Sequence, residues 1–542
     1  MKNATRYFAA LSMMALVVGL LSAAVRLATG AGEKGAVSVI RVTPPAPVFD
    51  DGKRLAELAE RRARVARTIG PKAILVLFSA EPRVYANDVD YEYRQENNLY
   101  YLTNLKQKGA TLVLMPGNPQ TPEVLFLPRR NPRSEVWTGH MYSSAEASQA
   151  SGVKEIWEAS EFEPFMRALR TRQSYRATAE GLLMSNSVSP TTPAVGSSDA
   201  AAANGFESLF AAVGKAEAEL YLLVPPEGES REYRQEQNFA AQWAKSATGF
   251  NVRNASPIFA VMRLRKSPME LEVLQHAIDI TIEAHERAQT IANHAQWEYE
   301  VDSEVAYTYK RRNADHWGYP SIVGCGPSAT TLHYIESQAP VKSGDLLLMD
   351  VGAEYDHYTA DVTRTFPVSG KFSPLQAEVY QIVYDAQEAA AKQIRPGVTI
   401  DTEQKAATEV IKNGLLKLGL ITDLNSNQYR IWYMHGSSHW LGMNVHDVGD
   451  YKTPLEPGMV FTNEPGIYVR LDALENLPKT AENGKFIAAV RPAFEKYKGI
   501  GVRIEDDIVV TADGCRWMTG ALPRSIADIE SFIAKARREQ LR

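Results

Sequence analysis

The stretch LLLMDVGAEYDHYTADVTRTF, residues 346–366, carries the strongest structural signal in this chain. Two runs rich in apolar and β-branched residues flank a polar Tyr355-Asp356 pair, which is the pattern of a β-hairpin. If this pair forms the turn, Asp350 and Asp361 become direct cross-strand partners. We therefore expect two carboxylates to face each other on one side of a sheet.

Two facing carboxylates repel each other unless they share protons or bind a cation. Oxygen ligands at this separation suit a divalent metal, and carboxylates that can bridge two ions suggest a dinuclear site that activates water. The alternative is that Asp350 and Asp361 are surface residues near a turn, where aspartate is common. The hairpin alone leaves both interpretations open.

The length and composition of the chain indicate an ordinary globular protein. Its 542 residues allow two or three domains, each large enough to bury a core. A formal net charge of −5, from 59 Lys+Arg and 64 Asp+Glu, gives no basic excess, so we expect no nucleic-acid partner. Two cysteines, Cys325 and Cys515, are too few for a disulfide scaffold; they form one bridge or stay free.

The N-terminus has the features of an export signal. Lys2 and Arg6 precede an apolar run at residues 7–25, and small residues follow it. This pattern predicts a signal peptide at residues 1–31, or a membrane anchor if that segment is not cleaved. We therefore expect a periplasmic or extracellular protein.

Residues 48–257 are predicted to form an α/β domain. A helical pattern at residues 55–69 leads into three strand-like runs at residues 73–80, 111–117 and 123–128. The small, polar and proline-containing segment at residues 186–204 is expected to be a loop or an insertion.

A second domain, at residues 262–535, follows. Ser267-Pro268-Met269-Glu270 is a capping box with proline at the first helical position, so a helix should begin at Pro268. Further on, the sequence predicts helices at residues 375–393 and 401–418 and strand-like regions at residues 319–334, 434–446, 460–468 and 502–510. Because the order of helices followed by strands occurs twice, we expect an internally duplicated α+β domain.

Three further motifs carry chemistry. HGSSHWLGMNVHD, residues 435–447, places three imidazoles within twelve residues, which favours a metal or catalytic role for at least one of them. Glu464 stands before a Pro-Gly turn in TNEPGIY, and Glu505 lies in the apolar run VRIEDDIVV. A charge among β-branched residues is rarely buried unpaired, so Glu505 needs a cation or Arg503 as its partner, unless it forms a surface ion pair.

Taken in order, these acidic and imidazole residues resemble the five metal ligands of the pita-bread metallopeptidases, and the aminopeptidase P (Xaa-Pro aminopeptidase) group in particular: Asp350, Asp361, His439, Glu464 and Glu505. The strings that carry the resemblance in the second domain are YPSIVGCGPSATTLHY, DVGAEYDHYTADVTRTF, HGSSHWLGMNVHD, NEPGIY and VRIEDD. YEYRQENNLYYLTNL (residues 91–105) and EVWTGH (residues 135–140) resemble the N-terminal domain that accompanies these peptidases.

The resemblance implies a pita-bread catalytic domain with two divalent ions. Asp350 would hold one ion, Asp361 and Glu505 would bridge both, and His439 with Glu464 would complete the second. Manganese is the expected metal, with cobalt or zinc as alternatives, since four carboxylates and one imidazole form a mostly hard-oxygen set.

The resemblance also implies roles in catalysis and binding. Glu464 would act as the general base, and His333 and His446 would contact the substrate and the developing negative charge. Tyr468 and Arg503 would line the substrate site or support the carboxylates. The expected substrates are peptides with proline at the second position, and the family implies a homo-oligomer, either a dimer or a tetramer.

Two features differ from the family pattern. The stretch at residues 469–500 is longer than the usual connection, and we expect a lid or an oligomer contact there. Most family members are intracellular, whereas this chain begins with an export signal.

Two alternative functions remain from the sequence. A dipeptidase (prolidase) would cut only Xaa-Pro dipeptides, and activity on a tripeptide distinguishes it from an aminopeptidase. A catalytically inactive binding protein of the same fold would have a broken ligand set, whereas all five ligands are present here.

Overall fold

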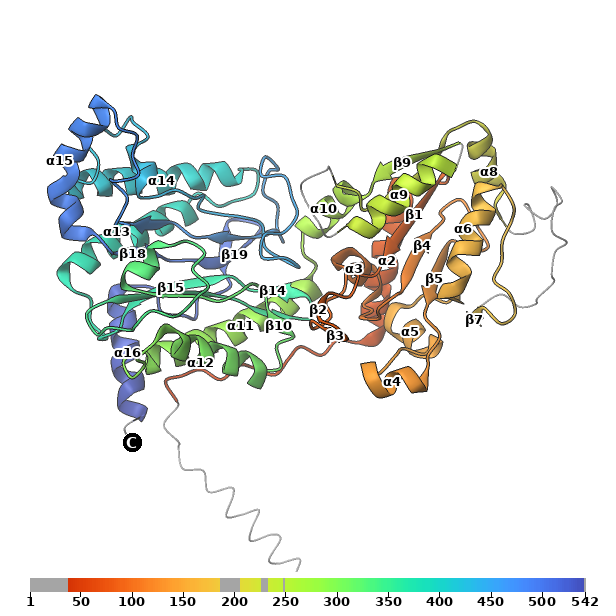
Figure 1. Cartoon of the computed structure of the whole chain (residues 1–542), viewed down its shortest axis with the longest axis horizontal. Coiled ribbons are helices and arrows are strands. Elements are labelled where there is room, and N and C mark those ends of the chain that lie inside the picture. Colours follow the sequence, from red (N-terminus) through yellow and green to blue (C-terminus); the bar gives the residue numbers. More distant parts are fainter. Residues whose placement is uncertain (1–37, 186–204, 226–232, 247–248, 541–542) are drawn as a thin grey trace, which may run out of the picture.

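The computed structural model describes residues 38–185, 205–225, 233–246 and 249–540, which form two domains side by side (Figure 1). The predicted export signal at residues 1–31 and the predicted insertion at residues 186–204 lie outside the described residues. Among the helices that the structure describes, none combines the length and the apolar character needed to cross a bilayer.

The N-terminal domain is built on a seven-stranded mixed sheet in the order β7-β6-β5-β4-β1-β8-β9. Its strands are β1 (Ala73–Phe78), β4 (Thr111–Leu114), β5 (Glu123–Leu127), β6 (Ile156–Glu158), β7 (Leu182–Met184), β8 (Ala218–Leu222) and β9 (Phe250–Asn254). All six residues of β1 are buried, and alternate side chains enter different cores: Leu75 and Leu77 one, Ile74 and Val76 the other. A continuous apolar run is what a strand covered on both faces requires, so the predicted α/β domain is confirmed.

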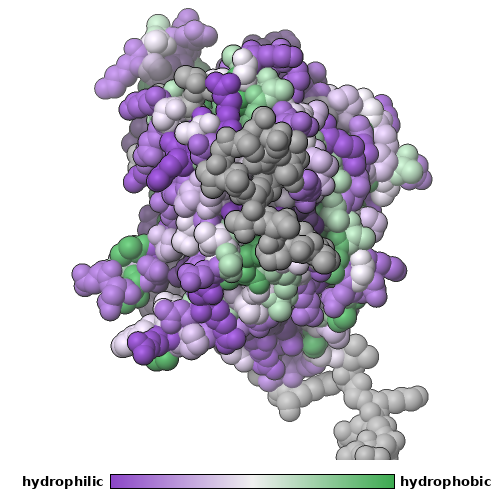
Figure 2. All heavy atoms as spheres, turned by 90° about the vertical axis from the view of Figure 1, so that its right-hand side faces the viewer, coloured by the Kyte–Doolittle hydropathy of each residue, from purple (hydrophilic) through white to green (hydrophobic). Residues whose placement is uncertain are grey.

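Helices supply the two cores of this sheet. One core receives side chains from α2 (Asp51–Ile69), α3 (Asn97–Thr103) and α5 (Ser144–Ser151), the other from α6 (Phe162–Arg170), α8 (Glu207–Gly214) and α9 (Arg234–Ser246). Outside the sheet lie the short hairpin of β2 (Val84–Ala86) and β3 (Val89–Asp90), α4 (Pro132–Thr138), and α10 (Ser256–Leu264), which leads to the second domain. On the face in Figure 2, hydrophobic residues occur in small groups within a mostly hydrophilic surface.

The C-terminal domain repeats one pattern twice. The helices α11 (Pro268–Ile291) and α12 (Glu298–Arg311) precede strands β10–β15, and α13 (Pro374–Ala391) and α14 (Ile400–Leu418) precede β16–β20. In Figure 1 the two helix pairs lie on opposite sides of the strands. The predicted duplication is therefore present, and the capping box at Ser267 begins α11 as expected.

The first half contributes two three-stranded sheets, and the second half one three-stranded sheet and one strand pair. The sheets of the first half have the orders β10-β13-β14 and β11-β12-β15, with strands β10 (His316–Trp317), β11 (Ile322–Cys325), β12 (Leu346–Val351), β13 (Ala353–Tyr355), β14 (Tyr358–Thr359) and β15 (Val362–Pro367). The second half has the order β16-β19-β20 and the pair β17-β18, with strands β16 (Val460–Asn463), β17 (Gly466–Tyr468), β18 (Gly501–Arg503), β19 (Asp506–Val510) and β20 (Cys515–Trp517). The helix α16 (Ile526–Gln540) ends the described chain.

The hairpin of the first half forms, but with a turn one residue later than predicted. Tyr355 pairs with Tyr358, so Asp356 and His357 make the turn, and both have positive φ, 49° and 68°. Positive φ at both central residues is the two-residue hairpin geometry that matches strand twist. Because the register moves, Asp350 pairs with Thr363, and the prediction that Asp350 directly faces Asp361 is wrong.

Two predicted strand regions are shorter or absent. Residues 319–334 contain only β11, followed by a 3₁₀ turn at Gly326–Thr330. Residues 434–446 form no strand; they pair with β16 in one isolated bridge, Trp440 with Phe461, and the Gly442 carbonyl accepts the Thr359 amide of β14. The apolar residues Trp440, Leu441 and Met443 of this segment are buried all the same. The backbone is held by single hydrogen bonds, such as the one that the Thr462 amide donates to the His439 carbonyl at 3.0 Å.

The long stretch at residues 469–500 contains a helix, α15 (Ala481–Tyr497), which the sequence did not predict. Phe486, Val490 and Phe494 pack into the main core of the domain, so this helix is an integral part of it. Cys325 and Cys515 are both free thiols, which decides between the two alternatives of the sequence.

Candidate metal centre

Asp350 and Asp361 come from the two arms of the hairpin. Asp350 lies in β12, and Asp361 lies in the break between β14 and β15, two residues before Thr363. The two residues are 7% and 4% exposed, and the Tyr319 hydroxyl lies 2.5 Å from an oxygen of each. The two carboxylates are therefore neighbours on one face, although they are not cross-strand partners.

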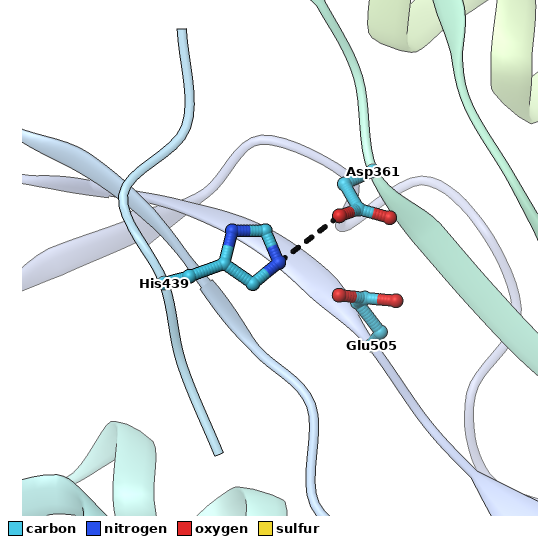
Figure 3. A group of neighbouring side chains, drawn as sticks. All are labelled: Asp361, His439 and Glu505. Carbon is cyan, nitrogen blue, oxygen red and sulfur yellow. Dashed lines mark ion pairs between the residues drawn. The ribbon is translucent and has the colours of Figure 1, made fainter. Parts of the chain in front are cut away.

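The second half of the domain brings an imidazole and two more carboxylates to this face. His439 comes from the 434–446 loop, Glu464 from the link between β16 and β17, and Glu505 from the link between β18 and β19. One ligand atom from each of Asp361, His439 and Glu505 lies within 4.8 Å of the others. Figure 3 shows the ring and both carboxylates pointing at one another.

His439 is held in an orientation that suits a metal ligand. Its Nδ1 lies 3.2 Å from the Trp440 carbonyl oxygen, and its Nε2 lies 3.2 Å from Asp361 and 3.5 Å from Glu464. A carbonyl that accepts from Nδ1 leaves Nε2, on the carboxylate side, for a metal. Burial would lower the pKa of His439, but the hydrogen bond to Asp361 and the charge of Glu464 raise it to about 9.

The charges of the site fit divalent cations. Burial and the neighbouring carboxylates raise the pKa of Asp350, Glu464 and Glu505, most strongly for Glu505. The ion pairs of this site join Arg503 to Asp350, His439 to Asp361 and Glu464, and His435 to Glu464. Burial lowers the pKa of His435 to about 3, so its ring adds no positive charge. Ionised carboxylates packed in this way require additional positive charge, and their oxygens are the donors that hard divalent ions prefer.

A layer of buried groups supports these ligands, and sequence reasoning had named only two of them. Arg503 donates to Asp350, to Thr363 Oγ1 at 3.0 Å and to Tyr468 at 2.8 Å, so the guanidinium and the phenol orient the carboxylates. Both side chains are almost fully buried, which favours their supporting role over direct contact with substrate. Glu505 accepts from Thr363 Oγ1 at 2.6 Å and not from Arg503, and at 1% exposure it is not a surface residue.

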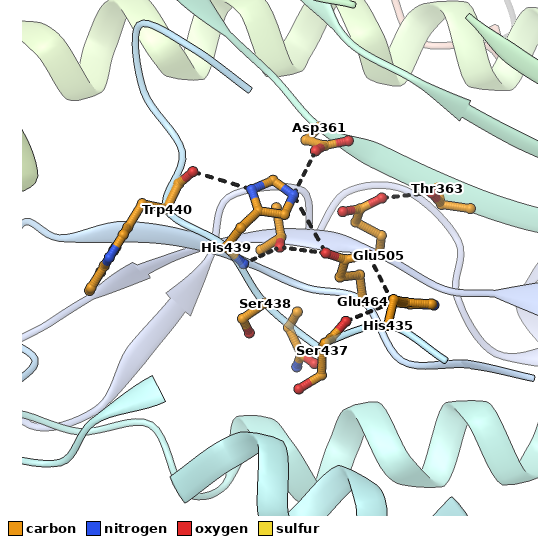
Figure 4. A network of polar contacts seen from close by, with 12 residues as sticks. Asp361, Thr363, His435, Ser437, Ser438, His439, Trp440, Glu464 and Glu505 are labelled. Carbon is orange, nitrogen blue, oxygen red and sulfur yellow. Dashed lines mark hydrogen bonds and ion pairs between the residues drawn. The ribbon is translucent and has the colours of Figure 1, made fainter. Parts of the chain in front are cut away.

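Three residues of this layer were missed by the sequence analysis: Tyr319, Thr363 and Asp507. His435 was one of the three imidazoles singled out in the 435–447 motif, but it was given no role of its own. His435 lies 2.8 Å from the Tyr468 hydroxyl and 3.7 Å from Glu464, and Asp507 accepts the Asp361 amide at 3.2 Å. Figure 4 shows Thr363 and His435 within the network around Glu505 and Glu464. A signal for Thr363 existed, because the predicted second strand of the hairpin contained both Asp361 and Thr363, and residues two apart in a strand share a face.

The two histidines assigned to substrate lie at the open side of the site. His333 and His446 are both exposed, and the ring centre of His446 is 4.3 Å from that of His439. Burial, together with the charges of His439 and His333, lowers the pKa of His446. The neutral ring can donate one hydrogen bond to a ligand that lies over the carboxylates.

Comparison with known proteins finds relatives along most of the chain. Residues 272–512 match the model for metallopeptidase family M24, and residues 58–177 match the aminopeptidase P N-terminal domain. An Xaa-Pro aminopeptidase of Haemophilus influenzae is 33% identical over 489 residues, which cover 88% of this chain and 97% of the relative. The chain belongs to the aminopeptidase P group of metallopeptidase family M24.

Solved structures of aminopeptidase P agree with this assignment. A variant of the Escherichia coli enzyme in complex with substrate has a TM-score of 0.72 and 30% identity, with 89% of this chain and 99% of that chain covered. The Pseudomonas aeruginosa enzyme gives the same values. The aminopeptidase P fold, with its pita-bread catalytic domain, thus spans nearly all of the described residues.

Proposed function

We propose that this protein is a dinuclear metal-dependent aminopeptidase that releases the first residue of peptides with proline in second place. The observation that carries the proposal is the convergence of Asp361, His439 and Glu505, with Asp350 and Glu464 beside them, in a buried site. The relatives with 32–33% identity are named Xaa-Pro aminopeptidases.

The five residues would hold two divalent ions, of which manganese fits best because four of the five side chains offer carboxylate oxygen; cobalt or zinc would also fit. When bound, such ions supply a water of lowered pKa and polarise the scissile carbonyl. Asp361 from the first half and Glu505 from the second offer ligand atoms within 4.8 Å of each other, which would suit a bridging role for both carboxylates.

The chain's own groups would move the proton and hold the substrate. Glu464, which lies 3.5 Å from His439 and 3.7 Å from His435, would take the proton of the attacking water and return it to the proline nitrogen. His333 and His446, at the open side, would donate to the substrate carbonyl as negative charge develops on it. Arg503 and Tyr468 would keep Asp350 in place.

Proline in second place has a physical basis. The bond before proline is a tertiary amide without N–H, so peptidases that bind a substrate through that N–H group cleave this bond poorly. A site that relies on carbonyl polarisation and on protonation of the leaving nitrogen does not need that hydrogen.

Export and assembly belong to the same proposal. Lys2, Arg6 and the apolar run at residues 7–25 support a periplasmic or extracellular enzyme, anchored to the membrane if residues 1–31 are retained. N-terminal sequencing of the expressed protein tests cleavage. Light scattering tests whether the protein is a dimer or a tetramer.

The test of activity uses an Xaa-Pro-Xaa tripeptide. The protein is stripped with chelator, and manganese, cobalt or zinc is added back to wild type, to Asp361→Ala and to the exposed control Asp513→Ala. We expect release of the first residue that returns with metal in wild type and control but not in Asp361→Ala. Cleavage restricted to Xaa-Pro dipeptides would establish a dipeptidase instead, and no cleavage with any metal would refute the proposal.

A further inference from the structure

The motif YEYRQENNLYYLTNL, residues 91–105, belongs to the N-terminal domain but has no part in the metal centre. It contains α3, whose residues are all buried, and Glu96 caps this helix by accepting the Leu99 amide at 2.7 Å. Three of its polar side chains, Arg94, Asn97 and Tyr100, point across the domain boundary. They contact two segments of the C-terminal domain that border the active site.

The first of these segments is the loop that carries His446. The Arg94 guanidinium donates to the Met443 carbonyl at 2.6 Å and, through Nε, to Glu354 at 2.8 Å. Asn97 accepts from Arg94 at 2.9 Å and donates to Asn444 at 2.8 Å. The N-terminal domain therefore hydrogen-bonds to the loop at Met443 and Asn444, three and two residues before His446.

The second segment is the turn of the aspartate hairpin. The Tyr100 ring stacks on His357 with centres 3.8 Å apart and planes 18° from parallel, and its hydroxyl bonds to Asp356. Glu354, which Arg94 binds, lies in β13 of the same hairpin. Arg94 thus connects the hairpin that holds Asp350 to the loop that holds His446.

The loop depends on these contacts because its own backbone is irregular. Residues 442–450 contain no helix or strand. On the far side, Asp447 is held by Arg263, and its backbone amide donates to the Trp440 carbonyl at 2.8 Å. The Leu441 amide still donates to the Val460 carbonyl, and the Gly442 carbonyl accepts the Thr359 amide. Residues 443–446 make no backbone hydrogen bond to a described strand, so the guanidinium that binds the Met443 carbonyl holds the backbone just before His446.

We propose that Arg94 is a positioning residue, through which the N-terminal domain sets the place of the His446 ring over the metal centre. The proposal rests on the proposed role of His446 in binding the substrate carbonyl. It assigns the 91–105 motif a direct part in the reaction geometry, beyond packing between domains.

The test compares Arg94→Ala and Arg94→Lys with Arg253→Ala, which removes a similar Arg–Glu pair, 2.9 Å to Glu219, inside the N-terminal domain. Arg94→Ala should lower kcat on an Xaa-Pro-Xaa tripeptide by about 10- to 100-fold, the usual effect of misplacing a catalytic group. Metal content should stay at the wild-type level. Arg94→Lys keeps the positive charge but replaces the planar fork of donors with a single ammonium group. It should fold, and its fold-loss in kcat should be about a third to a tenth of that in Arg94→Ala. Arg253→Ala should behave as wild type.

A double-mutant cycle separates positioning from general destabilisation. If Arg94 acts through His446, adding Arg94→Ala to His446→Ala should lower kcat by less than about 2-fold further. Amide hydrogen exchange should also rise in the peptide that covers residues 440–450 of Arg94→Ala, and not elsewhere in the C-terminal domain.

Each result has a clear meaning. An unchanged kcat in Arg94→Ala, a full additional loss in the His446→Ala background, or unchanged exchange in the loop would overturn the positioning role. A wild-type protein that cuts no Xaa-Pro peptide would instead refute the proposed function, and loop exchange would then still report whether Arg94 orders the loop.

Discussion

Arg364 joins the two halves of the catalytic domain, and replacing it with methionine should weaken both the fold and the site. The side chain lies in β15 and is fully buried. It donates to the Glu505 carbonyl at 2.7 Å, to the Thr363 carbonyl at 2.9 Å and to Asp506 at 2.6 Å. One guanidinium therefore bridges the strand after Asp361 to the strand after Glu505.

The expected loss of stability follows from burial. Methionine replaces the aliphatic part of arginine but donates nothing, so Asp506 and the carbonyls of Thr363, Glu505 and Pro523 lose a buried donor. Removing one partner of a fully buried ion pair costs about 3–5 kcal/mol. For a domain of this size, that corresponds to a fall in Tm of roughly 6–20 °C.

The assay is thermal unfolding followed by circular dichroism, with Arg67→Met as the control. Arg67 forms an ion pair with Glu60 on α2, but both side chains are more than half exposed, so this change should cost less than about 1 kcal/mol. Arg364→Met should also reduce metal content, because Glu505 and Thr363 lose their common support. A Tm within about 2 °C of wild type would refute the reasoning, since it would mean that the junction does not depend on this pair.

Three further predictions test other parts of the structure. A Cβ on Gly352 would lie 1.9 Å from the Ala360 carbonyl oxygen, so Gly352→Ala must push the two strands of the hairpin apart between its two aspartates. Calorimetry should show a loss of about 1–3 kcal/mol in the free energy of unfolding, and metal content should fall. Unchanged values would contradict the close approach of the two strands. Burial raises the pKa of Glu286, whose carboxyl accepts the Arg41 amide, to about 7. The contribution of Glu286 to the free energy of unfolding is therefore complete below pH 4.5 and is lost as the pH rises through 7. Relative to Glu286→Gln, wild type should lose about 2–3 kcal/mol between pH 5 and pH 8 in urea unfolding, and parallel curves of stability against pH for the two proteins would contradict this. Chelator should lower the Tm of wild type, by an amount equivalent to about 4 kcal/mol if the free metal had stood 1,000-fold above its Kd, and manganese should restore it, while Asp361→Ala should show no response to either.

Local signals in the sequence predicted the elements well where each was self-contained. The capping box at Ser267 fixed the start of α11, because its two hydrogen bonds lie within four residues. The apolar run of β1 was recognisable because a strand covered on both faces needs no polar alternation. The helix α15 was missed, since its burial depends on packing of Phe486 and Phe494 against a core that no local pattern describes.

The hairpin shows where local reasoning stops. The two runs of apolar and β-branched residues identified both strands, but they do not distinguish a turn at Tyr355-Asp356 from one at Asp356-His357, because aspartate suits either position. The tertiary contact of His357 with Tyr100 accompanies the observed turn, and this contact joins residues 257 positions apart. The register error moved the partner of Asp350 to Thr363, yet it left Asp350 and Asp361 in reach of one hydroxyl, Tyr319.

The candidate ligands could be predicted because five motifs occur in a fixed order, but the groups that hold them could not. Tyr319, Thr363 and Asp507 acquire their roles through hydrogen bonds to residues on other strands. A tyrosine before a proline or a threonine in a strand is ordinary in sequence. Only the fold shows that these side chains meet a carboxylate.

The position of the site at the junction of two repeated halves links metal binding to folding. Asp350 and Asp361 come from the hairpin of the first half, whereas His439, Glu464 and Glu505 come from the second, so neither half can form the site alone. Without cations, the carboxylates of the two halves repel each other across this junction, and Arg364 is one of the groups that hold it closed. Ions bound there would replace that repulsion with attraction, and their binding energy would add to the stability of the closed domain. A variant that loosens the junction without touching a ligand should therefore lose metal affinity and stability together.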